Sequence, residues 1–502
     1  MLTIKTAAKK KYFLLKTANT TCEVTKVENA DFDKAVEYVK NAFSDCADFN
    51  SRNLVYCGTK RGVLFNIGSY TDRDYISQSI MFPVMRMKNV PSSAEDIFGV
   101  IYSSELLTVG DENDACTKLL SGFAVLMLEL KSGFCILGCM VRRTAQRSVG
   151  EPDSEKVLKG PREGFIENAE DNLALLRKRL KTTCFKSLRM TAGELTGTTI
   201  YLCYIDGVAK KETVDRIKRV LENIRLPSVL DSGYIEHYLK KGRISLFPNA
   251  GSSEKPDVVA AKLLEGRVGI ICEGSPAVVT APYLFIEALQ SAEDYLKGGF
   301  YASFMRILRF ASLMISLYLP AVYLSTVEHH TSVLPYKLFK AVINLRRDVP
   351  FEVAGELFVI LFIFELIREV GVRKPGAVGD SVGIVAGLIL GDAAISAGLA
   401  SAPVIMVCSL TAVCTFIVPP FMNGLVLLRF ANIILADFLG FPGVVVSLCF
   451  LLCALCTKES FGVPYLLPFS PLGVGGLCDS LTVLPEKALK HVKNSIYPPR
   501  EE

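Results

Sequence analysis

Hydrophobic positions divide the chain into two unlike parts. Up to about Lys297, short apolar runs alternate with charged and amphipathic stretches, whereas apolar residues dominate from about Ile307 to Cys456. Within the first part, apolar runs at 53–56, 63–67 and 122–130, with an amphipathic stretch at 32–43, predict an α/β domain over residues 1–148. The predicted fold class is therefore an α/β soluble region followed by an α-helical multi-pass membrane domain.

A second α/β domain is predicted over residues 149–299. The charged stretch at 145–159 is typical of a linker. Pro161 is expected in the first turn of a helix that ends near Leu180, because acidic residues fill its first half and basic residues its second. The elements expected after it are a strand, a helix and another strand, at 199–205, 211–224 and 266–272.

Six apolar stretches follow, each close to the roughly twenty residues that a spanning helix needs. They lie at 307–327, 349–367, 381–400, 402–419, 422–439 and 444–456. The last stretch is short for a complete span, and Pro419, Pro420 and a glycine turn interrupt the series. The membrane domain is predicted over 300–459, with four to six spanning or re-entrant helices, and a cytoplasmic tail over 460–502.

Basic residues predict which side of the membrane the loops and the ends of the chain lie on. Four of them follow the first apolar stretch and favour a cytoplasmic loop there: Lys337, Lys340, Arg346 and Arg347. The tail is also basic, and no apolar run suited to a secretory signal follows the first lysines. Both ends are therefore expected in the cytoplasm, with an even number of crossings.

Composition weighs against two classes of protein. The net charge of +5 is small and scattered, and tryptophan is absent, so a nucleic-acid surface is not expected. Many of the fifteen cysteines lie in apolar runs and are expected to be free buried thiols, not a disulfide framework. Examples are Cys408, Cys414, Cys449, Cys453 and Cys456.

Enzyme signatures are missing from the sequence. There is no G-x-x-x-x-G-K-[ST] phosphate loop, no H-E-x-x-H and no G-x-S-x-G. His329 and His330 are adjacent, with Glu328 beside them, but a solvated loop is favoured over a metal site because no matching cysteine or histidine cluster lies nearby. We expect a protein that is not an enzyme and that carries no cofactor or metal.

Ionisable residues within the apolar stretches are the candidates for pore lining or coupling. A charge at bilayer depth costs roughly 2.5–3.5 kcal/mol on insertion scales and needs a protein or water partner. The candidates are Glu356, Glu365, Arg368, Glu369 and Asp392, and the fifth stretch adds Arg429 and Asp437.

Helical spacing places Glu365, Arg368 and Glu369 on one face, whereas Glu356 points to nearly the opposite side. Two interpretations carry equal weight. One is a water-filled path lined by the same helix from several subunits. The other is a structural ion pair between Glu365 and Arg368.

Glycines in the third apolar stretch repeat at G-x-x-x-G spacing: Gly383, Gly387 and Gly391. Small residues at this interval let helix backbones approach closely. Packing within one subunit is the preferred interpretation, and an oligomer or pore contact is the alternative.

One conspicuous motif runs through the start of the second predicted domain and contains the run Gly-Pro-Arg-Glu-Gly-Phe-Ile-Glu at 160–167. Its candidate residues are Gly160, Pro161, Arg162, Glu163, Phe165, Glu167, Asn172, Arg177 and Arg179. Further pieces lie at 231–236, 245–248, 255–257, 263–268, 293–295, 349–351, 365–369 and 460–465. Together, from about residue 50 to 475, they resemble the GerA family of spore germination proteins. Lys255 and Glu352 depart from the arginine and proline usual there.

The resemblance implies an A-type subunit of a nutrient germinant receptor in the inner membrane of a bacterial spore, with its amino-terminal region in the spore core. Such subunits act beside a nutrient-sensing integral-membrane B subunit and a lipoprotein C subunit. The A-type subunit is expected to oligomerise and form a gated channel that releases monovalent cations. The 160–167 motif would be a coupling element or, equally, a fold-defining turn and helix cap.

Three alternatives stay open. Stage V sporulation protein AF has the same architecture and is expected to amplify the germination response with a different partner. A non-conducting scaffold for sensor subunits would use its intramembrane charges for packing alone. A secondary transporter ranks last, because no inverted repeat is visible in the sequence.

Overall fold

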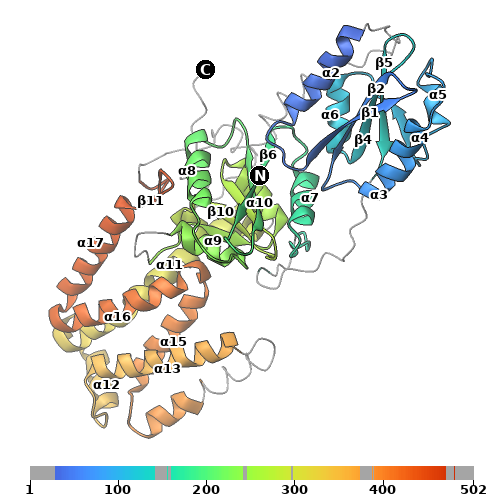
Figure 1. Ribbon diagram of the computed structural model, residues 1–502. Helices are drawn as coiled ribbons and strands as arrows, with labels where there is room; N and C mark the ends of the chain where they lie inside the picture. The colour runs from blue at the N-terminus through green and yellow to red at the C-terminus, as the bar shows by residue number, and fades with distance from the viewer. Residues whose placement is uncertain are drawn as a thin grey trace.

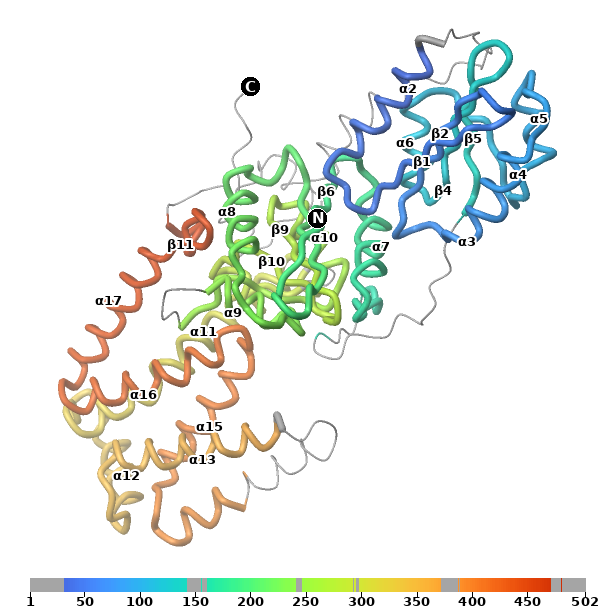
Figure 2. Tube along the Cα trace, viewed as in Figure 1, coloured from blue at the N-terminus to red at the C-terminus, as the bar shows by residue number. Residues whose placement is uncertain are grey.

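The computed structural model describes residues 29–141, 155, 160–240, 246–295, 298–373, 387, 389–470 and 480 (Figure 1). Two five-stranded sheets lie beside one another, and a group of helices extends from the second sheet on the side away from the first (Figures 1 and 2). Most of the predicted linker, Gly383 and most of the tail beyond residue 470 lie outside the described residues.

The first sheet has the order β1-β2-β4-β5-β3, and every pairing in it is antiparallel. Its strands are β1 (Phe49–Tyr56), β2 (Lys60–Ile67), β3 (Leu106–Thr108), β4 (Phe123–Glu129) and β5 (Phe134–Met140). Helices α2 (Asn29–Ala42) and α6 (Glu112–Leu120) pack on one face. Shorter helical turns cover the other, namely α3 (Arg73–Tyr75), η1 (Ile76–Met81), α4 (Phe82–Met85) and α5 (Glu95–Phe98). The strand-like runs and the amphipathic stretch predicted here are confirmed.

The second sheet has the order β6-β7-β9-β10-β8 and is also antiparallel. Its strands are β6 (Phe185–Ala192), β7 (Thr198–Ile205), β8 (Gly251–Ser253), β9 (Val268–Cys272) and β10 (Val278–Ala281). Helices α7 (Ala169–Arg179) and α10 (Pro256–Leu264) cover one face, and α8 (Lys211–Glu222) and α9 (Ser232–Leu239) the other. The predicted helix at 211–224 and the predicted strands at 199–205 and 266–272 are confirmed, and their ends agree to within two residues.

The prediction that the first helix of this domain begins at Pro161 is wrong. Helix α7 begins at Ala169, and residues 161–166 form neither helix nor strand. Asn168 caps the helix by accepting a hydrogen bond from the N–H of Asp171 at 2.9 Å. The Asn172 side chain accepts from the N–H of Ile166 and donates to its carbonyl, which keeps the preceding segment extended.

The helical region follows two 3₁₀ turns, η2 (Phe285–Leu289) and η3 (Ala292–Tyr295). Its long helices are α11 (Gly299–Leu324), α13 (Val353–Arg373), α15 (Ala402–Phe416), α16 (Met422–Leu439) and α17 (Phe441–Thr457). Residues 389–396 are also helical. Shorter elements are η4 (Ser325–His329), η5 (Thr331–Val333), α12 (Tyr336–Arg346), η6 (Pro419–Phe421), β11 (Glu459–Ser460) and β12 (Val463–Pro464).

Two of these segments are long and apolar enough to cross a membrane. Gly299–His329 has a mean hydropathy of 1.7 and Pro419–Leu439 of 1.5, and less than half of each is buried within the chain. Helices α15 and α17 are apolar but shorter. Helix α13 is long, but it carries Glu356, Glu365, Arg368 and Glu369.

The cysteines of the described residues are free thiols. Cys408 and Cys414 are buried, as expected from their apolar surroundings. Cys449, Cys453 and Cys456 are exposed on α17, so the expectation that they are buried is wrong for the single chain. An apolar neighbourhood in sequence predicts an apolar helix, but it does not tell a protein-facing side from an outward-facing one.

Candidate functional site

Arg429 of α16 is the centre of a buried polar cluster between the helices. Its side chain is 2% exposed, and its Nε donates to the carbonyl of Ser316 on α11 at 2.9 Å. A second nitrogen donates to the hydroxyl of Thr415 on α15. Its third nitrogen lies 3.7 Å from the carboxylate of Glu365 on α13. One guanidinium therefore ties together four helices.

The Ser316 carbonyl needs this donor because of Pro320. In a helix the N–H four residues later normally bonds this oxygen, and proline has no N–H. Asn432, one turn beyond Arg429, donates to the neighbouring carbonyl of Leu317 at 3.2 Å. Helix α16 thus supplies side-chain donors to the backbone of α11 where proline interrupts it.

Glu365 and Arg368 form an ion pair at 2.7 Å within α13. Together with Arg429 they make up a set that we call the interhelical charge cluster. Helical spacing predicted the first pair, whereas the contribution of Arg429 depends on the packing of α13 against α16. The sequence signal that could have found it is an arginine in one apolar helix opposite an internal proline in another.

Glu356 occupies a different site on α13, as its position on the opposite face predicted. It is 1% exposed and accepts hydrogen bonds from the backbone N–H and the hydroxyl of Ser401, at 2.8 and 2.7 Å. Arg346 pairs with its other oxygen at 3.1 Å. Since Ser401 is the cap residue before α15, Glu356 stabilises the start of that helix.

The remaining candidates from the apolar stretches do not join these two sites. Glu369 and Asp392 are both exposed. A Cβ placed at Gly387 or Gly391 meets nothing within 4 Å in the described part of the chain, and Gly383 lies outside it. Among these residues, close packing instead requires glycine at Gly424 and Gly443, where a Cβ would clash with the carbonyl oxygens of Leu246 and Leu435.

His329 and His330 lie at the turn after α11, where they contact other helices. The Nε2 of His329 lies 2.7 Å from the carbonyl of Asp437, and the ring of His330 packs against Phe441. Among the described residues no group of three metal-ligating side chains gathers here or elsewhere.

The soluble region is joined to the helices by a second feature, which we call the junction: residues 246–249 with 458–465. The Lys458 ammonium donates to the carbonyls of Phe247 and Pro248, at 2.6 and 3.5 Å, and lies 4.3 Å from the centre of the Tyr465 ring. Burial and the nearby Lys240 lower the pKa of Lys458 to about 8.

Further hydrogen bonds connect the junction to the chain that flanks the second sheet. The Ser460 hydroxyl donates to the carbonyl of Asn249 at 2.8 Å and accepts from the N–H of Tyr283 at 3.2 Å. The N–H of Phe285 donates to the carbonyl of Tyr465 at 3.0 Å. These contacts link the chain after β10 to the hairpin after α17.

The family motif lies at the contact between the two sheets. Arg177 of α7 is fully buried and donates two hydrogen bonds to Asp48, which precedes β1, at 2.5 and 2.6 Å. Burial alone would lower the pKa of Arg177, but the Asp48 carboxylate holds it above its usual value. The N–H of Ala47 also donates to the carbonyl of Ser187 at 2.7 Å.

The other motif residues fix the extended segment before α7. Glu163 pairs with Lys178 and Arg179, which lower its pKa. Phe165 packs into the core under α7, and its N–H donates to the backbone carbonyl of Glu254. The carbonyl of Glu167 accepts from Gly274, while Pro161 and Arg162 are exposed and Gly160 has a φ of 132°.

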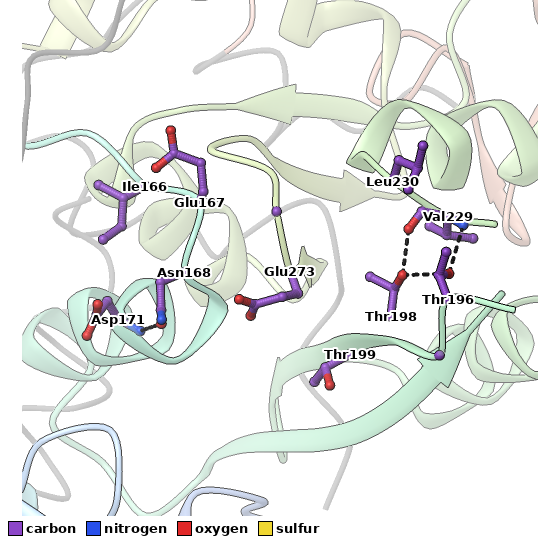
Figure 3. Close-up of a pocket in the computed structure, with 12 residues that line it drawn as sticks. Ile166, Glu167, Asn168, Asp171, Thr196, Thr198, Thr199, Val229, Leu230 and Glu273 are labelled. Carbon is purple, nitrogen blue, oxygen red and sulfur yellow. Dashed lines mark hydrogen bonds between the residues drawn. The ribbon is translucent and has the colours of Figure 1, made fainter.

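An open cleft of about 790 Å³ lies beside this segment (Figure 3). Its lining comes from residues 166–168, 171, 196–199, 229–230 and 273–274. The carboxylates of Glu167, Asp171 and Glu273 and three threonine hydroxyls border it. Glu273 accepts from the N–H of Ala169 at 3.0 Å, so part of this acidic rim serves the helix start.

These features define a class: a protein with a two-sheet α/β region joined through a built junction to apolar helices that share buried charges. The sequence profile described as Bacillus/Clostridium GerA spore germination protein matches residues 37–494. The chain belongs to this family, as the resemblance predicted.

Several curated relatives are similar over most of the chain. "Uncharacterized membrane protein YfkQ" of Bacillus subtilis is 33% identical over 85% of this chain and 83% of its own length. "Spore germination protein KA" of the same organism is 37% identical over 69% of this chain and 64% of its own, just under two thirds. "Spore germination protein B1", also from B. subtilis, is 32% identical over 86% of this chain and 90% of its own.

One solved structure covers 53% of this chain and 99% of its own, with 25% identity and a TM-score of 0.40. It is the N-terminal domain of the A subunit of the Bacillus megaterium spore germinant receptor GerK3. The chain is thus a spore germination protein by family, and one relative is named a membrane protein.

Proposed function

We propose that this chain is the A-type subunit of a germinant receptor in the spore inner membrane and that it oligomerises into a gated channel for monovalent cations. The observation that carries the proposal is the interhelical charge cluster, with Arg429 buried at 2% exposure among apolar helices. Charges at this depth are costly and mark ion or substrate paths in membrane proteins.

Two further observations support an assembly of several copies. Helices α13 and α17 expose large apolar side chains in the single chain, including Phe362 and Phe450. The faces of Gly387 and Gly391 meet nothing in the described residues, which favours the oligomer contact over packing within one subunit. Glu369 and Asp392 are exposed on the same region and would line the passage.

The junction would carry the signal. A nutrient-sensing B subunit and a lipoprotein C subunit are the proposed partners, and their binding would act on the α/β region in the spore core. Movement there reaches α16 and α17 through Gly424, Lys458 and Ser460. Both ends of the chain would lie in the spore core.

The test is ion flux through liposomes that hold the purified full-length chain with and without its partners. We expect cation release that depends on the partners and the germinant, and that falls at least tenfold in Glu365→Gln. Glu356→Gln is the matched control, because this acid caps α15 on the opposite face. No flux under any condition, with Glu365→Gln unchanged in spores, would contradict the channel.

Two alternatives make different predictions. A stage V AF-type amplifier would copurify from spores with partners other than B and C subunits, and the similarity to YfkQ, whose name assigns no receptor role, keeps this candidate in view. A non-conducting scaffold would lose its assembly when Gly387 is enlarged, while ion release would not depend on Glu365.

A further inference from the structure

Most residues of helix α12 (Tyr336–Arg346) are exposed. It connects α11 to α13 at the end of the helical region away from the two sheets (Figures 1 and 2). Val342 is its one buried residue. Four large apolar side chains are exposed on it, at 76%, 50%, 47% and 56%: Tyr336, Leu338, Ile343 and Leu345. The chain's own core therefore leaves most of this helix uncovered.

Three exposed cations accompany these apolar residues. Lys337, Lys340 and Arg347 take part in no ion pair among the described residues, whereas Arg346 is half-buried and pairs with Glu356. At about 100° per residue the three cations fall within one sector of the helix. The apolar residues form two flanks, Leu338 with Leu345 on one side and Tyr336 with Ile343 on the other. The exposed surface of the helix is therefore a basic face between two apolar flanks, and Val342 is buried on the opposite side.

We propose that α12 is an interfacial helix that binds the surface of an anionic phospholipid bilayer. Its cations contact headgroup phosphates, and its apolar flanks enter the boundary with the acyl chains. Tyr336, at the first position of the helix, has the amphipathic ring that is enriched at this depth. In chain order the helix lies between the segment Gly299–His329, which is long and apolar enough to cross a membrane, and α13, so a bilayer is the surface nearest to it.

Charge argues against a second copy as the occupant. A two-fold contact through the same face would bring like charges together, with three cations from each chain. The proposal rests on the membrane placement of the helical region and not on conduction, so a sealed, non-conducting assembly leaves it standing.

The absence of tryptophan makes a clean test possible. Tyr336→Trp gives the full-length protein a single indole, whose emission can be excited selectively. The protein is placed in nanodiscs of phosphatidylcholine with or without phosphatidylglycerol. We expect lipids with brominated chains to quench the indole emission of this variant, more strongly when phosphatidylglycerol is present, and added salt to reduce that difference. Leu338→Trp reports on the other flank and replaces the first reporter if that variant fails to fold.

Charge removal gives the decisive comparison. Lys337→Gln, Lys340→Gln and Arg347→Gln together should abolish the dependence on phosphatidylglycerol. The matched control removes the same charge from α8 of the soluble region, through Lys211→Gln, Lys218→Gln and Arg219→Gln, and should leave it unchanged. Equal quenching by aqueous acrylamide in both kinds of disc would overturn the proposal. So would shielding of the indole in Tyr336→Trp that arises only when a disc holds a second protein.

Discussion

At the scale of single residues, Arg429 shows how one side chain stabilises an interrupted helix. Replacing it with methionine would leave the Ser316 carbonyl without its donor and Glu365 with one cation fewer. Breaking a buried pair in this way costs about 3–5 kcal/mol. We expect Arg429→Met to lower the thermal unfolding temperature of the full-length protein in detergent, with Arg429→Lys recovering part of the loss.

The matched comparison is Arg368→Gln, which removes the other cation beside Glu365. Its side chain is 22% exposed, so water can replace much of what is lost. A smaller effect is expected, of about 1 kcal/mol. Equal effects of the two substitutions would mean that the carbonyl opposite Pro320 does not need Arg429.

Lys458 gives a pH prediction. Its pKa is lowered to about 8 in the folded protein from 10.5, so between these values Lys458 binds its proton more in the unfolded chain, and its contribution to stability rises with pH. The full difference corresponds to at most about 3 kcal/mol. We expect Lys458→Met to remove this contribution, so that the unfolding midpoint of the variant falls relative to that of the unchanged protein between about pH 8 and pH 10.5. An unchanged slope would show that another group titrates there.

Residue chemistry was predictable from sequence where it depended on local spacing and not where it depended on packing. The positions of Glu365 and Arg368 on one turn follow from their three-residue interval, as does the opposite placement of Glu356. By contrast, Arg429 and Lys458 each have a partner more than a hundred residues away, the carbonyls of Ser316 and Phe247. No pattern within one helix contains that information.

At the scale of elements, the glycines also show that local spacing is predictable from sequence and that packing is not. The G-x-x-x-G interval predicts a smooth helix face, but it does not say what lies against it. Within the described helices, Gly424 and Gly443 are the glycines that lie close to another backbone segment, and no such interval marks them. Helix α7 is a parallel case, because proline permits a helix start at 161 while Asn168 and Asn172 hold the chain extended until Ala169.

The junction makes a prediction about Gly424. A methyl group there would clash with the backbone oxygen of Leu246, so Gly424→Ala must displace the loop or the helix. We expect it to cost about 1–3 kcal/mol and to raise hydrogen exchange in residues 246–249 and in the first turn of α16. Gly387→Ala is the control and should leave the exchange of both segments unchanged, since nothing described lies within 4 Å of it. Equal exchange in both variants would contradict a rigid junction.

At the scale of the whole molecule, the order of parts agrees with the sequence. The two α/β regions and the apolar helices were visible as a change in hydrophobic periodicity. Strands β1, β2, β4, β7 and β9 follow the apolar runs that were predicted, whereas the other strands of the two sheets were not predicted. How the parts are joined was not visible. The contact between the sheets depends on Asp48, which lies in a turn without any distinctive pattern, and on Arg177, known beforehand only as part of a motif.

This contact is where the arrangement of the soluble region can be tested. Asp48→Ala would leave the guanidinium of Arg177 fully buried without its carboxylate, at a cost of about 3–5 kcal/mol. Because Ser69 and Ser187 also donate to Asp48, both sheets lose a shared acceptor. We expect hydrogen exchange to rise in β1 and β6 together, and Asp48→Ala with Arg177→Met to cost less than the sum of the single changes. Asp33→Ala, which removes an exposed partner of Arg61, should cost under about 1 kcal/mol. If exchange rises only in β1, the sheets are held by other contacts, and a signal could not pass from the first sheet to the helices through α7.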